Sequence, residues 1–574
     1  MISRQRSSYR LLGLVGNGQF GRVYCGVHRK TGHLVAIKHL HRHSLPTHAF
    51  LRELHCLLKL EHPNIVACHA LEHTPEGRLL VLEYCAGGTL RSHMAAPPSA
   101  ADILTLLSDM LGGLAYAHQQ GVIHCDIKPE NILLTYRQGR WRAKISDFGI
   151  AKLIEEQSYR RGSGQTGSPA YMAPERFYCQ YSPAADVYAM GIILYELLMG
   201  HRPFAGTPAD LQSAHLNQPV PKVKGYTDAI QHIITKALEK LPARRYPTAA
   251  EMLADLQSIT QENLPCPSQV SPSYYPYTGA SHLPLTQPVS HMQALPATAD
   301  RVAQTVLAQG KQLTTYPSAQ ERGLDSPIQG LYSAPTGLMV STACTLWHGS
   351  NSAALAPIVR WPAPSLVAVD PRHRWAAAVT PSLQRLTITQ LPRANQMSHH
   401  QPISLAPDIH IDQVLTVDGG HVAIAGRTQQ CESQLQLWNR RGMSLGSLNL
   451  GIPLRQFTPM RQPYQWLAID INDPQTVIFL ILKPLRITPM RLDILPTLML
   501  DLPWGYLFSD AQGRILLLDR DFQSIGGIQG PAQATAIVSP RPHELLVATW
   551  QAGIFCSGGL HRLNLQNFEL DIIF

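Results

Sequence analysis

The sequence lacks any hydrophobic run long enough to cross a membrane. Its longest fully apolar stretches, such as Val477 to Leu482, fall far short of the roughly 18 residues that a spanning helix needs. The amino-terminal residues MISRQRSSYRLLG also lack the apolar core of a secretory signal. We therefore expect a soluble protein without a transmembrane segment, and a cytoplasmic localisation.

Paired cysteine motifs are absent as well. The ten cysteines form no CxxC pair and have no histidine at the spacing of a zinc site. They stand at positions 25, 56, 68, 85, 125, 179, 266, 344, 431 and 556. Scattered cysteines of this kind are typical of unpaired thiols in a reducing compartment.

Runs of Lys and Arg interleaved with aromatic residues are missing, so we expect no nucleic-acid partner. The net charge of +9 is nevertheless uneven. Residues 1–250 hold 28 Lys and Arg against 18 Asp and Glu, whereas residues 251–574 hold 20 against 21. The positive charge belongs to the first part of the chain, where phosphate ligands, an acidic substrate or simple solvation would each explain it.

The stretch HCDIKPEN, from His124 to Asn131, carries an acid, a cation and an amide at the spacing that phosphoryl transfer to a hydroxyl requires. In this interpretation Asp126 receives the proton of the acceptor, Lys128 steadies the transferring phosphate and Asn131 holds a metal. The chemistry then demands an ATP pocket upstream and a second metal-binding Asp downstream. Asp147, in the tripeptide DFG that follows, meets the second demand.

A glycine-rich run, GNGQFGRV, lies upstream and follows a segment that is predicted to be a strand. Its glycines would let a hairpin lie close over phosphates, and its valine would cover the base. These residues are Gly16, Gly18, Gly21 and Val23. A dinucleotide-binding turn would require a helix after the glycines. Residues 22–27 alternate like a second strand instead, which favours the hairpin.

Lys38 stands on the predicted third strand and needs a carboxylate, because a buried lysine without a partner would be costly. Residues 49–60 are apolar at helical spacing, and Glu53 on the first turns of that helix is the candidate partner. Beyond a further apolar strand, the backbone between Glu83 and Cys85 would meet the adenine edge.

These motifs occur in the order in which eukaryotic-like (Hanks-type) serine/threonine protein kinases carry them, and the chain resembles the bacterial members of that family from Gly16 to Arg245. The resemblance covers nearly half of the chain. It implies a bilobal α+β protein kinase fold that transfers the γ-phosphate of ATP to Ser and Thr hydroxyls of protein substrates. It also implies ATP and Mg²⁺ as cofactors, with Mn²⁺ as an alternative metal.

The resemblance also assigns roles to single residues. It implies catalysis by Asp126, Lys128, Lys38 and Glu53, metal binding by Asn131 and Asp147, and nucleotide binding by Gly16, Gly18, Gly21, Val23, Ala36, Lys38, Glu83, Cys85 and Leu133. Asp126 would be the base, and Lys128 is the form typical of Ser/Thr kinases. Two further roles are structural: Glu175 would pair with Arg245, and Asp186 would anchor the backbone of the HCDIKPEN loop.

Cys125 departs from the family pattern. Family members usually carry Arg between the His and the Asp of this loop, where it pairs with a phosphorylated activation segment. A thiol cannot form such a bidentate phosphate bridge. We therefore expect activity to depend less on phosphorylation of that segment than in kinases with the Arg. A regulatory thiol that is oxidised, and a small buried filler, are the alternative interpretations.

The sequence divides into three parts, of which residues 1–260 are the kinase domain. Prolines then recur among Ser, Thr and Gln with no Lys or Arg before Arg301, so residues 261–332 are predicted to be a Pro-rich linker. From residue 333, short β-type runs alternate with Asp, Gly and Pro turns, beginning at Asp370 and Asp418. Turn spacings of 48, 55, 37 and roughly 30 residues favour a degenerate β-propeller over residues 333–574. A β-sandwich is the alternative.

The sequence therefore predicts an ATP-dependent serine/threonine protein kinase whose C-terminal all-β domain binds a protein partner, recruits substrate or senses a signal. The competing hypothesis is a signalling scaffold in which the C-terminal surface matters most and the kinase domain is secondary or vestigial. The enzyme is favoured because Lys38, Asp126, Asn131 and Asp147 are all present.

Overall fold

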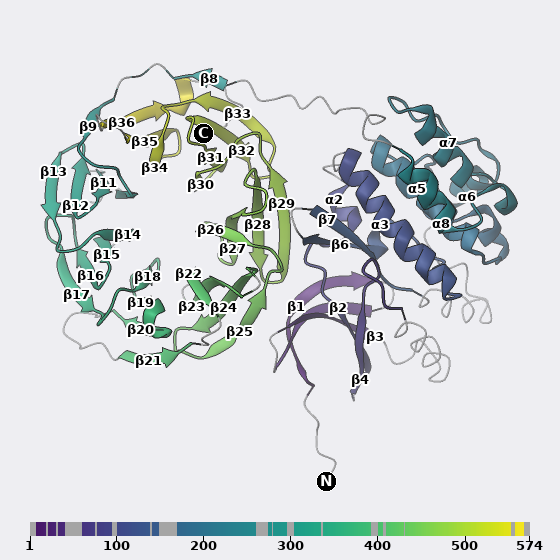
Figure 1. Cartoon of the computed structure of the whole chain (residues 1–574), viewed down its shortest axis with the longest axis horizontal. Helices are drawn as coiled ribbons and strands as arrows, with labels where there is room; N and C mark the ends of the chain where they lie inside the picture. Colours follow the sequence, from purple (N-terminus) through teal and green to yellow (C-terminus); the bar gives the residue numbers. More distant parts are fainter. Residues whose placement is uncertain are drawn as a thin grey trace, which may run out of the picture. The chain divides into compact units, whose positions relative to one another are not determined.

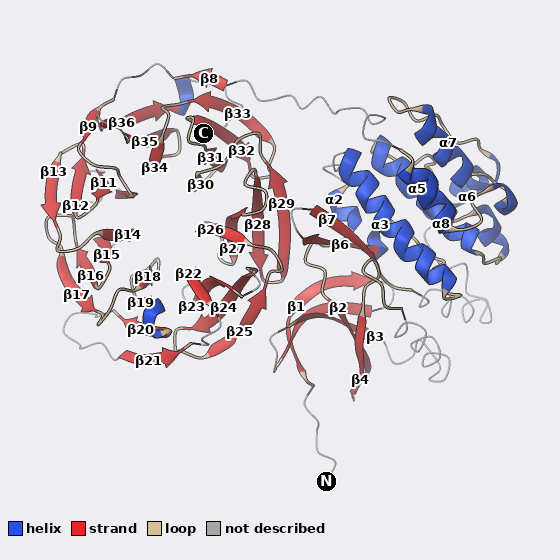
Figure 2. Cartoon of the chain, viewed as in Figure 1, coloured by secondary structure: helices blue, strands red, loops and turns tan. Residues whose placement is uncertain are grey.

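The structure is a computed structural model that divides into two compact units, one with residues 1–269 and the other with most residues from 270 on. It describes residues 7–18, 21–29, 33–40, 60–74, 77–94, 100–137, 140–148, 169–259, 274–277, 279, 281–295, 304–334, 337–391, 400–405, 409–418, 420–429, 431–552 and 557–567. The first unit combines a sheet with helices, whereas the second is formed by strands (Figure 2).

The first unit begins with a five-stranded antiparallel sheet of order β1-β2-β3-β5-β4. Its strands are β1 (Tyr9–Gly18), β2 (Gly21–His28), β3 (Leu34–Leu40), β4 (Cys68–Thr74) and β5 (Gly77–Glu83). Val35 and Ile37 lie two residues apart on β3 and pack with Val81 of β5, so one face of the sheet is buried. The glycine-rich run therefore joins two strands, as the sequence predicted.

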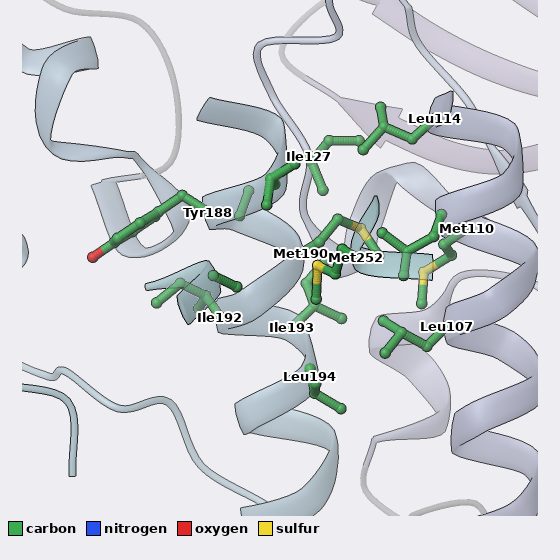
Figure 3. Packing of buried hydrophobic residues seen from close by; sticks show 14 of the residues in the cluster. Leu107, Met110, Leu114, Ile127, Tyr188, Met190, Ile192, Ile193, Leu194 and Met252 are labelled. Carbon is green, nitrogen blue, oxygen red and sulfur yellow. The ribbon is translucent and has the colours of Figure 1, made fainter. Parts of the chain in front are cut away.

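In the residues that the structure describes, the rest of the first unit contains six α-helices and a hairpin. They are α2 (Leu90–His93), α3 (Ala100–Gln119), α5 (Pro183–Met199), α6 (Pro208–Asn217), α7 (Asp228–Ala237) and α8 (Ala249–Gln257), with the hairpin of β6 (Ile132–Arg137) and β7 (Arg140–Ile145). Helix α5 is apolar on nearly all sides and is buried almost throughout. Figure 3 shows Met190 and Ile193 of α5 beside Met110 of α3 and Met252 of α8. Among the described helices, none is long and apolar enough to cross a membrane.

His215 of α6 is fully buried against aromatic rings. Its Nδ1 lies 2.8 Å from the Tyr188 hydroxyl, and the Phe204 ring centroid lies 5.0 Å from its own. Burial, reinforced by the positive charge of Lys240, lowers the pKa of His215 to about 4. The folded domain therefore holds a neutral imidazole at neutral pH.

We expect this histidine to destabilise the first unit in mild acid. Between pH 6.5 and 4 the unfolded chain binds a proton at His215 that the folded chain does not bind, so stability falls as the pH falls, by about 3 kcal/mol over the window. Urea unfolding at pH 7 and pH 4.5 measures this loss. The His215→Gln variant should lose less stability than the wild type, and equal losses would show that His215 does not titrate as described.

The second unit contains seven sheets in the residues that the structure describes, and in Figure 1 they follow one another around a common centre. The first three sheets contain β10 (His291–Leu295), β11 (Gln304–Gln309), β12 (Gln312–Tyr316) and β13 (Gln320–Gly323); β14 (Ile328–Ala334), β15 (Gly337–Thr342), β16 (Thr345–Gly349) and β17 (Ala356–Arg360); and β18 (Leu366–Val369), β19 (Trp375–Thr380), β20 (Arg385–Gln390) and β21 (His400–Ser404). The next two contain β22 (His410–Asp418), β23 (His421–Arg427), β24 (Ser433–Asn439) and β25 (Ser444–Asn449); and β26 (Leu454–Pro459), β27 (Gln465–Asp470), β28 (Thr476–Leu482) and β29 (Leu485–Arg491). The last two contain β30 (Leu498–Leu502), β31 (Gly505–Ser509), β32 (Arg514–Asp519), β33 (Ser524–Gln529) and β8 (Tyr274–Pro276); and β34 (Ala534–Arg541), β35 (Glu544–Gln551), β36 (Ser557–Asn564) and β9 (Leu283–Leu285).

The predicted extent of the linker is wrong. Residues 261–332 contain strands β8 to β13 and the start of β14, so most of this segment belongs to the second unit. Strand β9 pairs with β36, and β8 pairs in parallel with β33. The prolines that suggested a linker include Pro276 and Pro284, which lie on edge strands, where the missing N–H need not remove a ladder hydrogen bond.

Candidate active site

Strand pairing brings the predicted nucleotide-binding residues of the sheet together. Val23 of β2 lies opposite Lys38 of β3. Ala36 precedes Lys38 by two residues and therefore shares its face of the strand. The preceding hairpin contains Gly16, Gly18 and Gly21. Gly16, Val23 and Lys38 thus lie in one row across β1, β2 and β3, as a phosphate-binding hairpin requires.

The end of β5 is fixed by contacts with two neighbouring segments. The Glu83 N–H donates to the carbonyl of Ala67 at 2.8 Å, and the Glu83 carboxylate lies 2.9 Å from Nζ of Lys144 on β7. Leu133 of β6 is directly opposite Lys144 in the hairpin, which brings it to the same region. Cys85 is buried, and burial raises the pKa of its thiol to about 12, so the thiol stays neutral.

The HCDIKPEN loop is held by its own side chains. Lys128 Nζ lies 2.6 Å from the Asp126 carboxylate. Asn131 Nδ2 donates to the Asp126 carbonyl at 2.7 Å and to its carboxylate at 3.1 Å. His124 is buried, and its Nε2 lies 2.7 Å from the carbonyl of Ser146. The loop is thereby fixed to the residue before Asp147.

Asp147 meets Lys38, although 109 residues separate them in the chain. Lys38 Nζ donates to Asp147 Oδ1 at 2.6 Å. Burial opposes ionisation of Asp147, but the Lys38 ammonium and further positive neighbours hold the pKa of Asp147 below its ordinary value. The carboxylate is therefore ionised. Glu53, the predicted partner of Lys38, lies outside the described residues.

Asp186 of α5 holds the backbone of the loop, as the sequence predicted. Its Oδ1 accepts the Cys125 N–H at 2.8 Å and its Oδ2 accepts the His124 N–H at 2.8 Å. Cys125 has a φ of 68°, in the left-handed region that residues with a side chain rarely adopt. The two hydrogen bonds hold this conformation directly before Asp126.

The predicted pair of Glu175 and Arg245 is also confirmed. The Arg245 guanidinium donates to both Glu175 oxygens, at 2.7 and 2.8 Å, and both side chains are buried. Such a pair fixes the segment after residue 168 to the helical part of the unit. It lies apart from the contacts of Asp126, which supports a structural role.

A cluster around Arg91 was not predicted from the sequence. The Arg91 guanidinium lies 2.8 Å from Glu130 in the loop and 2.9 Å from Glu196 on α5, and it also donates to the Tyr171 hydroxyl. The Arg91 cation on α2 therefore joins three other segments: the loop, α5 and the segment that contains Tyr171. Nothing in the spacing of these residues points to the contact, because each is an ordinary polar residue within its own segment.

Comparison with known proteins agrees with this geometry. Residues 9–256 match the protein kinase domain family. The chain is 35% identical over 276 residues to serine/threonine-protein kinase Pkn1 of Myxococcus xanthus, and 32% identical over 262 residues to serine/threonine-protein kinase PrkC of Bacillus subtilis. These alignments cover 46% and 44% of this chain and 40% of each relative.

A mammalian protein shows a shorter match. The chain is 38% identical over 198 residues, or 33% of its length, to human serine/threonine-protein kinase D2, of which the alignment covers 22%. All three matches thus span less than half of the relative. Residues 9–256 are therefore a protein kinase domain, similar in sequence to those of serine/threonine protein kinases.

Proposed function

We propose that the protein transfers the γ-phosphate of ATP to Ser and Thr hydroxyls of protein substrates. The observation that carries this proposal is two sets of contacts of 2.6 to 3.1 Å, one between Lys38 and Asp147 and one that joins Lys128 and Asn131 to Asp126. The N–H of Ser146, which precedes Asp147, donates to the Asn131 carbonyl at 2.8 Å and links the two sets. Together the five residues supply two carboxylates, two ammonium groups and an amide, which phosphoryl transfer requires.

Each of these side chains has a separate task in the proposed reaction. Asp126 accepts the proton of the attacking hydroxyl, and Lys128, 2.6 Å from it, places positive charge beside the transferred phosphate. Lys38 binds the α- and β-phosphates. Its hydrogen bond to Asp147, the proposed metal ligand, supports this role.

Asn131 and Asp147 fit a divalent metal such as Mg²⁺ or Mn²⁺. Asn131 directs its Nδ2 to the Asp126 carbonyl, which leaves the amide oxygen as the ligand atom, and Asp147 is ionised. Oxygen donors of this kind suit Mg²⁺. When bound, the metal neutralises phosphate charge. Asn131 and Asp147 would be the side chains that hold this metal.

The nucleotide itself would lie between the hairpin and the end of β5. The proposed lining residues are Gly16, Gly18, Gly21, Val23, Ala36, Lys38, Glu83, Cys85 and Leu133. Backbone N–H groups of the glycines would bind phosphate oxygens, and Val23 with Ala36 would cover the base. We propose Glu53 as the second partner of Lys38.

An assay with labelled ATP, Mg²⁺ and a generic basic protein tests the proposed reaction. The full chain should label Ser and Thr of the protein, whereas the Asp147→Asn variant should not. Absence of transfer by the wild type under these conditions, with the protein folded and ATP bound, would favour the scaffold hypothesis. Label on Tyr alone would contradict the proposed acceptor.

We propose further that the second unit is a β-propeller that recruits substrate or senses a signal. Support comes from contacts between first strands of neighbouring sheets: β10 contacts β14, β14 contacts β18, β18 contacts β22, β22 contacts β26, β30 contacts β34, and β34 contacts β10. Strand β9 adds the fourth strand of the last sheet. Contacts between the first strands of neighbouring sheets, and a last sheet completed by an early strand, are both expected where propeller blades surround an axis.

The role of this unit is tested by comparing residues 1–260 with the full chain. We expect the full chain to phosphorylate its physiological substrate faster, because a binding surface raises the local substrate concentration. Rates on a short synthetic peptide should be the same for both proteins. Equal rates and equal substrate choice with cellular proteins would leave the second unit without a recruiting role.

Cys125 leads to a prediction about activation. Since its thiol cannot bridge a phosphate, alanine at Ser163 or Thr166 should lower kcat by less than about a hundredfold. Ser168 is a separate case, because it matches the family's hydroxyl residue that bonds near the catalytic Asp. All three serine and threonine positions lie outside the described residues.

Steady-state kinetics on dephosphorylated protein measure the effect. The Cys125→Arg variant is the matched comparison, since it restores the family's usual residue and should make activity more sensitive to alanine at Ser163 and Thr166. A collapse of more than a hundredfold in the Cys125 background would refute the hypothesis.

A further inference from the structure

The turns of the second unit carry charge of opposite sign at the two ends of its strands. In four consecutive antiparallel strands, the first-to-second and third-to-fourth turns lie at one end, and the other turns and the connections to the next sheet lie at the opposite end. Among the described residues of this unit, the turns at the first end contain six arginines and two acidic residues, whereas those at the opposite end contain one lysine and five acidic residues. The six arginines are Arg372, Arg374, Arg440, Arg441, Arg461 and Arg520.

The third, fourth and fifth sheets, which begin with β18, β22 and β26, have the same orientation. Gln413 and Phe457, near the middle of β22 and β26, are joined by a hydrogen bond of 2.8 Å. Beyond the middle, the Tyr464 hydroxyl after β26 donates at 2.6 Å to Asp418, the last residue of β22. The two strands therefore run in the same direction, and their arginine-bearing turns share one face.

The third sheet is aligned with the fourth in the same way. Gln384 in its second-to-third turn donates to the carbonyl of Ile409, directly before β22 begins. The opposite end of the third sheet thus lies beside the opposite end of the fourth. Gly442, in the third-to-fourth turn of the fourth sheet, packs against β21 of the third sheet, since a Cβ there would come within 2.6 Å of Ile403.

Hydrogen bonds also join the turns to one another. The Arg440 N–H donates to the Gly420 carbonyl at 2.8 Å, in the turn that follows Asp418. Asp418 in turn accepts the hydroxyl of Tyr464, which ends the turn that contains Arg461. The arginine-bearing turns of the fourth and fifth sheets are therefore parts of one continuous surface.

Four arginines of this surface have charge to offer a ligand. Their side chains are exposed and form neither an ion pair nor a hydrogen bond with any residue that the structure describes. Of the two acidic residues in these turns, Asp370 is already paired with Arg374, and Asp521 is exposed. We call the four the arginine rim: Arg372, Arg440, Arg441 and Arg461.

The arrangement of the rim suits an extended acidic chain. The guanidinium group matches a carboxylate with two parallel hydrogen bonds. The four groups are distributed over three sheets, so a ligand with its charge spread along a chain can reach them together, whereas one isolated anion cannot. Single-stranded nucleic acid is bound with aromatic rings on which bases stack. Among the described residues of the second unit, the large hydrophobic side chains that are exposed include no aromatic ring.

We propose that the arginine rim is a docking surface for an extended segment of a protein partner that is rich in Asp and Glu. This inference rests on the proposed recruiting role of the second unit and specifies the chemistry of what it recruits. Its binding test is independent of kinase activity, because the rim residues belong to the second unit and take no part in the proposed phosphoryl transfer.

Fluorescence anisotropy with the full-length protein and a labelled synthetic peptide measures the binding. The acidic peptide alternates Glu and Ser over about 16 residues, and the neutral peptide carries Gln in place of Glu. We expect the acidic peptide to bind at least about tenfold more tightly than the neutral one. Its affinity should fall steeply when NaCl is raised from about 50 to about 300 mM, because salt screens exposed charges.

Two double variants with equal loss of charge locate the surface. The rim variant combines Arg440→Gln with Arg461→Gln, and its affinity for the acidic peptide should fall about 3- to 30-fold, since each exposed ion pair contributes modestly. The control combines Arg385→Gln with Arg455→Gln, at the opposite end of the strands. These two arginines are also exposed and form no ion pair with the described residues. The control variant should bind within about 1.5-fold of the wild type.

Three results would overturn the proposal. Equal weakening in both variants would mean that the peptide responds to net charge and not to the rim. Tighter binding of a peptide with one phosphoserine and no carboxylate side chains would indicate a site for a single phosphate group. Tighter binding of single-stranded RNA of the same charge, lost in the rim variant, would indicate a nucleic-acid surface.

Kinase kinetics separate this proposal from the proposed function. When a substrate peptide is joined to the acidic segment by a Gly/Ser linker, its KM should fall in the wild type and rise again in the rim variant, with kcat unchanged. An inactive wild type that binds the acidic peptide through the rim would refute kinase activity and keep the docking surface. An active enzyme whose rim variant binds the peptide as tightly as the wild type would refute the docking surface alone.

Discussion

The Asp126→Asn variant is expected to lose phosphoryl transfer by a factor of about 10² to 10⁴ in kcat. Asparagine has the same size and keeps the backbone carbonyl that accepts from Asn131, so the loop should keep its shape. What it loses is the group that accepts the hydroxyl proton. KM for ATP should change little, because the nucleotide is bound by other residues.

Steady-state kinetics with Mg²⁺-ATP and a basic peptide measure this effect. Asp109→Asn is a suitable control, since Asp109 also pairs with a cation, Arg142, and accepts a backbone N–H, that of Ala143, without touching the loop. Its kcat should stay within about threefold of the wild type. Undiminished transfer by the Asp126→Asn variant would refute the assignment of the base.

The site was largely predictable where local chemistry dictates the residues. Lys128 and Asn131 contact Asp126 within the same loop, so short spacing in the sequence is enough to bring them together. The strands that carry Val23 and Lys38 were predictable for a similar reason, because alternating apolar residues indicate a sheet with one buried face.

Contacts between distant segments were predictable only where a motif marked both partners. Arg245 and Glu175 belong to such motifs, and their pair is confirmed. Lys144 and His118 do not belong to such motifs. Lys144 contacts Glu83, 61 residues away, and His118 contacts Asp186, 68 residues away. No sequence pattern indicates the partner of a lone lysine on a strand or of a histidine in a helix, so only the fold reveals the contact.

The error in the linker has a different cause. A segment rich in proline resembles a chain that cannot order itself, because its own residues bury little surface. Strands β8 and β9 gain their order from β33 and β36, which lie some 250 to 275 residues later in the chain. Composition describes a segment by itself and says nothing about a distant sheet edge that accepts it.

The Arg245→Met variant should destabilise the first unit by about 3 to 5 kcal/mol, because it leaves the Glu175 carboxylate buried without its partner. The side chain of Arg245 is 0% exposed and that of Glu175 is 6% exposed, so water cannot replace the lost bonds without opening the unit. Arg245 also donates to the carbonyls of Glu239 and Lys240, which lose their partner as well. Urea unfolding followed by fluorescence measures the change.

A second substitution decides whether the buried charge is the cause. When Arg245→Met is combined with Glu175→Leu, no unpaired carboxylate remains, and hydrophobic replacement of a buried ion pair is often neutral or stabilising. The double variant should therefore be more stable than the Arg245→Met variant, even though it carries one substitution more. If the two losses simply add, the cost lies in the other bonds of Arg245 and not in the unpaired Glu175, because independent contributions are additive.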